Sequence, residues 1–92
     1  MLYPFMTLED QTEIVHSESY HIDGKEYVRV EIEKPVPGGF KAAQCLLPGY
    51  EWSEINGFTD TEIQQYQEVI ESLAHIIIRL AREGGFESAA GF

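Results

Sequence analysis

The chain has three histidines, His16, His21 and His75, and an imidazole can serve as a metal ligand or as a general base. No two of them have the i, i+4 spacing that places two ligands on one metal, and no Cys-x-x-Cys pair is present. His75 follows Glu71 by one helical turn, where a Glu–His contact is ordinary surface stabilisation. We therefore predict no metal site, no cofactor and no catalytic residue.

Cys45 is the only cysteine, so the chain can form no disulfide within itself, which suits a reducing compartment. As a nucleophile it would need a neighbouring base that lowers the pKa of the thiol. Ala43, Cys45 and Leu47 alternate as the buried face of a strand does, so we predict that Cys45 belongs to the core. A small enzyme that uses Cys45 or a histidine is kept as an alternative.

Acidic residues dominate the charge of the chain, with 16 Asp and Glu against 6 Lys and Arg and a net charge of −10. Such a charge repels phosphates, so we expect no nucleic-acid partner. No basic residue lies between Lys41 and Arg79, whereas six acidic residues do: Glu51, Glu54, Asp60, Glu62, Glu68 and Glu71. This surface either keeps the protein soluble or docks a basic protein, and it could also mimic the charge of DNA.

Four segments have the pattern of β-strands: residues 3–8, 12–20, 25–34 and 40–47. Asp23-Gly24 is typical of a tight hairpin turn, and Val28, Val30 and Ile32 then alternate with polar side chains. One face of the predicted sheet is therefore exposed to water. Residues 48–58 are interpreted as an ordered loop that Trp52 and Phe58 attach to the core.

A helix is predicted over residues 60–83, because Thr59 and Glu62 form a capping box and Gly84-Gly85 provides a stop. Its apolar residues recur three and four apart and should face the sheet: Ile63, Tyr66, Ile70, Leu73, Ile77 and Leu80. The sequence thus predicts one α+β domain over residues 1–92. It is a four-stranded antiparallel meander with one long C-terminal helix on one face, in two layers, followed by a frayed tail at 86–92.

Two isoleucines, Ile76 and Ile78, flank the apolar stripe of the predicted helix on opposite sides. One sheet cannot cover both flanks, so we predict that Ile76 and Ile78 belong to a homodimer interface. The competing explanation is that the loop at 50–58, or Phe86 and Phe92 of the tail, covers one flank within a monomer.

The longest aliphatic run, residues 76–78, is far shorter than the roughly 20 residues of a membrane span. The N-terminus has neither the basic region nor the long apolar region of a signal peptide. We therefore expect a cytoplasmic protein without contact to membranes.

Four segments together resemble a group of small uncharacterised proteins of clostridial gut bacteria: residues 3–7 (YPFMT), 47–52 (LPGYEW), 56–58 (NGF) and 81–85 (AREGG). The resemblance implies a bacterial cytosolic origin, and it brings no activity, cofactor or catalytic residue that could be carried over to this chain. The strand pattern, the Leu47-Pro48-Gly49 turn and the following helix are also similar to HicB-like antitoxins, although Cys45-Leu46 stands where that family has aspartates.

The apolar pattern is explained by packing, and no cluster of titratable residues remains that would require an active site. The predicted function is therefore a small, acidic, non-enzymatic protein-interaction module that associates with itself. The alternatives are a HicB-like antitoxin or an acidic inhibitor that mimics nucleic acid, and the small enzyme named above.

Overall fold

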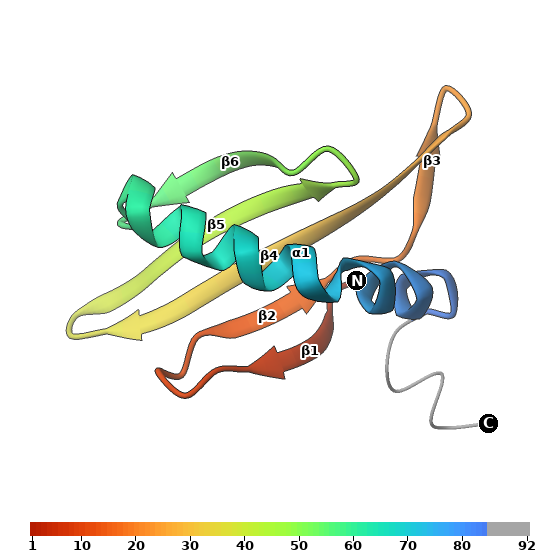
Figure 1. Ribbon diagram of the computed structural model, residues 1–92. Coiled ribbons are helices and arrows are strands. Elements are labelled where there is room, and N and C mark those ends of the chain that lie inside the picture. The colour runs from red at the N-terminus through yellow and green to blue at the C-terminus, as the bar shows by residue number, and fades with distance from the viewer. Residues whose placement is uncertain (85–92) are drawn as a thin grey trace.

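The computed structural model describes residues 1–84 and has an α+β architecture, with one antiparallel sheet and one C-terminal helix (Figure 1). The strands are β1 (Tyr3–Thr7), β2 (Glu13–His16), β3 (Tyr20–Ile22), β4 (Lys25–Val36), β5 (Gly39–Leu47) and β6 (Glu51–Asn56), and the helix is α1 (Asp60–Arg82). The predicted fold class is thereby confirmed. The predicted tail at 86–92, with Phe86 and Phe92, lies outside the described residues.

The sheet has six strands, so the prediction of four was wrong. The main path is β1-β2-β4-β5-β6, and β3 pairs with the other half of β4. β4 is the central strand because its 12 residues pair with β5 on one edge and with both β2 and β3 on the other.

The segment at 12–20, predicted as one strand, is interrupted at Ser17, which separates β2 from β3. The hydroxyl of Ser17 accepts the backbone N–H of Arg29 at 3.0 Å, in the place of a backbone carbonyl. Ser19 lies between the two strands, and its backbone N–H donates to the carbonyl of Ala81 in α1 at 3.1 Å. The side chain of Ser17 thus competes with the strand ladder, and the backbone hydrogen bond of Ser19 to α1 completes the division of the strand.

The segment at 48–58, interpreted as a loop, contains β6 instead. β6 pairs with β5 through Cys45↔Trp52 and Gln44↔Ser53, and a bulge follows. Glu54 has φ 51° at this bulge, which breaks the apolar–polar alternation by which a strand is recognised. Phe58 is buried, as expected for a residue that attaches this segment to the core. The indole N–H of Trp52 donates to Gln67 Oε1 of α1 at 2.9 Å.

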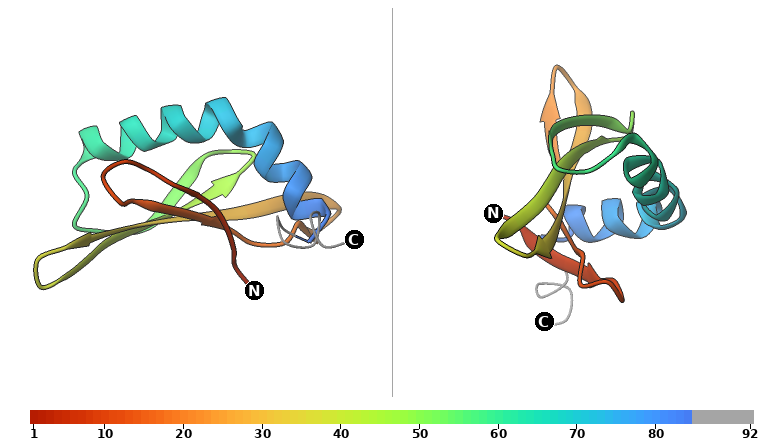
Figure 2. Two further views of the ribbon diagram at one scale, coloured as in Figure 1. Left: turned by 90° about the horizontal axis from the view of Figure 1, so that it is seen from below. Right: turned by 90° about the vertical axis from the view of Figure 1, so that its left-hand side faces the viewer.

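The helix α1 lies along one face of the sheet, and no other described helix or strand covers the opposite face (Figure 2, left). Its N-terminus has the predicted capping box between Thr59 and Glu62. The core lies between the two layers. From the sheet it takes Ile14, His16, Val28, Val30, Ile32, Ala43, Cys45 and Leu47, and from the helix Ile63, Tyr66, Ile70, Ile77, Leu80 and Ala81. Within the described residues, no helix is both long and apolar enough to cross a membrane.

Candidate interaction surface

Cys45 lies in the centre of the core, with an exposed fraction of 0%. Burial raises the pKa of its thiol to about 12, so the thiolate that nucleophilic chemistry requires is scarce at neutral pH. The nearest histidine in the sheet register is His16, two strands away, because Val30 of β4 pairs with both residues. Two strand spacings amount to about 10 Å, which is too far for a hydrogen bond between thiol and imidazole.

His16 is also fully buried, with an exposed fraction of 0%. Its Nδ1 lies 2.8 Å from the carbonyl oxygen of Ser17, so Nδ1 carries the proton and donates it. Its Nε2 is buried and has no hydrogen-bond partner among the described residues. The rings of Tyr3 and Phe5 pack against the imidazole at centroid distances of 5.7 and 6.4 Å. His16 therefore acts as a core residue of β2.

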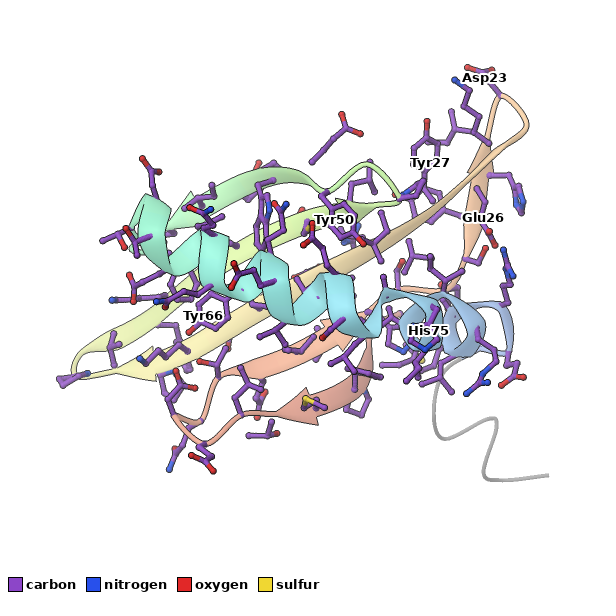
Figure 3. All side chains as sticks on the ribbon, viewed as in Figure 1. Asp23, Glu26, Tyr27, Tyr50, Tyr66 and His75 are labelled. Atoms are coloured by element: carbon purple, nitrogen blue, oxygen red, sulfur yellow. The ribbon has the colours of Figure 1, made fainter. Side chains whose placement is uncertain are left out.

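The other two histidines lie apart from His16 and from each other. His21 is exposed on β3. His75, which Figure 3 labels, is exposed on α1. Among the described residues, no group of three or more His, Cys, Asp or Glu side chains could hold a metal ion. The structure thus brings none of the candidate catalytic side chains together.

The two isoleucines predicted to form an interface are both half-buried. Ile78 packs against the core cluster and shares a small cavity with Val28, Leu47 and Pro48, at the turn between β5 and β6. The chain itself therefore covers much of Ile78. Ile76 is not among the partly buried side chains that pack against this cluster, so it is the more available of the two.

The helix end is fastened to the hairpin of β3 and β4 by Glu26, which Figure 3 shows on that hairpin. Arg82 donates to both carboxylate oxygens of Glu26, at 2.8 Å from Nε and 2.6 Å from Nη2, and the hydroxyl of Ser19 donates to one of them. The hydrogen bonds from Arg82 are the main reason why the pKa of Glu26 falls to about 2.

This pKa predicts a pH-dependent contribution to stability. An unfolded Glu has a pKa near 4.5, so Glu26 stabilises the fold above that pH, and the contribution is lost as the pH falls towards 2. Glu26→Gln should therefore lower the melting temperature at pH 7, and the difference from the parent should shrink steadily between pH 4.5 and 2. Thermal melts over this range, with Glu68→Gln as the control, measure it. A difference that is the same at every pH would contradict the ion pair.

A second polar cluster attaches the turn between β1 and β2 to the helix. The hydroxyls of Thr12 and Tyr66 share a hydrogen bond of 3.0 Å, and Thr12 is completely buried. Asp10 accepts the backbone N–H of Thr12 at 3.0 Å and forms an ion pair with Lys34 at 3.5 Å. The hydrogen bonds with Thr12 are the main reason why the pKa of Asp10 is lowered. Every polar group of this cluster has a partner, so its role is structural.

The face of the sheet opposite α1 carries side chains whose presence is not explained by packing within the described residues. We call it the open sheet face. Successive side chains of a strand point to opposite faces of the sheet. The residues that alternate with the buried positions of β2, β4 and β5 therefore lie on the open sheet face. They are Glu13, Val15, Tyr27, Arg29, Glu31, Glu33, Pro35, Phe40, Ala42, Gln44 and Leu46. The open sheet face is therefore partly apolar and partly charged.

Apolar side chains on this face are incompletely covered. Val15 and Leu46 are half-buried, Pro35 is exposed, and Phe40 has an exposed fraction of 61%. Arg29 and Glu31 form an ion pair with an Nε–Oε2 distance of 2.9 Å between Val15 and Leu46 in the register. The sequence predicted that one face of the sheet is exposed to water. The alternation of β4 alone did not show that β2 and β5 contribute apolar residues to that face.

Comparison of the chain with protein-family models, with curated proteins and with solved structures finds no match.

Proposed function

We propose that the protein is a non-enzymatic protein-interaction module and that the open sheet face is its contact surface. The observation that carries the proposal is the presence of Val15, Leu46 and Phe40 on a face that no described element covers. Antiparallel sheets tolerate one face in water when that face is polar. Aromatic and aliphatic side chains on such a face, bordered by charged residues, are typical of a protein interface.

The distribution of reactive groups supports a binding role over an enzymatic one. A general base or a nucleophile must lie within hydrogen-bond reach of its partner in the site. Cys45 and His16 are buried on separate strands, whereas His21 and His75 are exposed on different elements. The described surface thus offers residues for contact and no assembled catalytic group.

A second copy of the chain is the other candidate partner, because Ile76 is an incompletely buried isoleucine at the flank of α1. Such an interface would lie on the helix layer and leave the open sheet face available. The two candidates can therefore be distinguished by the position at which a partner is bound.

Photo-crosslinking in the native cells tests both candidates with one set of variants. Benzoylphenylalanine replaces Leu46 on the open sheet face, Ile76 on the flank of α1, or Glu68 on the solvent side of α1 as the control. We expect one discrete product with another protein from position 46 and none from position 68.

Each outcome has a separate meaning. A product of twice the mass of the chain from position 76 identifies self-association at the helix flank. This result supports the interaction module but contradicts the open sheet face as its contact surface. Equal labelling from all three positions, or no product from any, overturns the proposed function.

A further inference from the structure

The open sheet face has a hollow of about 340 Å³ near the tip of the β4–β5 hairpin. Figure 1 shows this hairpin extending beyond the end of α1. Six residues line the hollow: Thr7, Gln11, Glu13, Glu33, Pro35 and Phe40. They come from β1, the β1–β2 turn, β2, β4 and β5, so the hollow is formed by several strands of the sheet. We call it the acidic hollow.

Two of its carboxylates lie directly opposite each other, because Glu13 of β2 pairs with Glu33 of β4. Like charges in this position destabilise a sheet. Both side chains are exposed, and no described Lys, Arg or His forms an ion pair with either of them. The fold thus carries an electrostatic penalty at this point that a bound cation would relieve.

The same hollow has an apolar wall formed by Pro35 and Phe40, which are paired across β4 and β5. Pro35 follows Glu33 by two residues on the same face of β4, so the apolar wall continues directly into the carboxylates. Phe40, with an exposed fraction of 61%, presents an aromatic ring there. A guanidinium group stacks on aromatic rings and pairs with carboxylates, whereas a phosphate or a carboxylate would be repelled.

A second copy of the chain matches this hollow poorly. The chain has six Lys and Arg residues, and Arg29, Lys34, Lys41 and Arg82 already form ion pairs within it. Two copies whose acidic hollows met would also bring Glu13 and Glu33 of both copies close to one another, which opposes self-association through this hollow. Charge complementarity therefore favours a different, basic protein.

We infer that the open sheet face docks an arginine-bearing basic segment of a partner protein. An arginine side chain enters the acidic hollow, stacks on Phe40 and pairs with Glu13 and Glu33. The inference rests on the proposed function and adds to it the chemistry of the partner.

A fluorescent peptide of alternating arginine and glycine is the probe, titrated by anisotropy against the full chain at low salt. Glu13→Gln/Glu33→Gln should weaken binding about tenfold, because two charge-assisted hydrogen bonds are lost. Glu68→Gln/Glu71→Gln, which removes the same charge from the exposed side of α1, should weaken it less than about twofold. Phe40→Ala should weaken it about two- to fivefold, as expected for an exposed cation–π contact, and Ile55→Ala is its matched control.

Equal losses in the two glutamate double variants would show binding to the net charge alone and overturn the inference, as would the absence of binding. A melting temperature of Glu13→Gln/Glu33→Gln below that of the parent would also contradict it, because relief of the repulsion should not destabilise the fold. These failures concern the partner's chemistry. If the peptide experiment fails in one of these ways but position 46 still gives a crosslink, the proposed function stands and only this inference is lost. If position 46 gives no crosslink and the peptide binds unspecifically, the proposed contact surface and this inference are both lost.

Discussion

The thiol of Cys45 is expected to react with DTNB about a thousandfold more slowly in the folded protein than in the unfolded chain at the same pH. Only the thiolate attacks, and burial raises the pKa of this thiol from 9.0 to about 12. Three pKa units lower the thiolate population by about a thousandfold near neutral pH. The complete burial of Cys45 also denies the reagent access.

The measurement compares the rates of colour development at pH 8 with and without guanidinium chloride. The chain has one cysteine, so the whole signal comes from Cys45, and Cys45→Ser provides the blank. A reaction in native buffer as fast as that of the unfolded chain would show that the thiol is accessible and would contradict its burial in the core. Only a reaction faster than that of the unfolded chain would indicate an activated thiol and favour the alternative of a small enzyme.

Truncation of the core at Ile70 or Val30 is expected to lower the free energy of unfolding by about 2–4 kcal/mol each. Ile70 of α1 and Val30 of β4 have exposed fractions of 1% and 0%, and both belong to the cluster between helix and sheet. Alanine at either position removes buried methyl groups and leaves a cavity that close packing cannot fill.

Urea unfolding of Ile70→Ala and Val30→Ala measures this loss, and Glu68→Ala is the control. Glu68 lies on the exposed side of α1, two residues from Ile70, so its truncation should change stability by less than about 0.5 kcal/mol. An Ile70→Ala variant that unfolds at the same urea concentration as the parent would contradict the packing of α1 on the sheet.

The fold class, the helix cap and the hairpin turn could be predicted because each depends on neighbouring residues. Thr59 and Glu62 are three residues apart, and Asp23-Gly24 has φ angles of 52° and 78°, which suit the two-residue turn that the pair predicts. The division of β2 from β3 could not be read in this way. It depends on the contact of Ser19 with Ala81, which lies 62 positions further along the chain.

The candidate surface was only partly predictable for the same reason. Alternation in β4 showed that Glu31 and Glu33 face water, but it gave no sign that Glu13 lies opposite Glu33. The cover of Ile78 by Val28, Leu47 and Pro48 likewise depends on where the β5–β6 turn lies beside the helix. Strand register and tertiary contacts, which short-range patterns do not encode, decide both.

The outer strands of the sheet restrict how a partner can bind. The pairing of β1 shifts register between Pro4 and Met6, and Pro4 has no N–H group to donate. The pairing of β6 with β5 shifts register between Ala42 and Gln44. Neither border thus offers the regular row of backbone donors and acceptors onto which a further strand can be added. At these two borders, recognition by strand addition and stacking of chains into fibrils are both disfavoured, so a partner that binds there must be recognised through side chains.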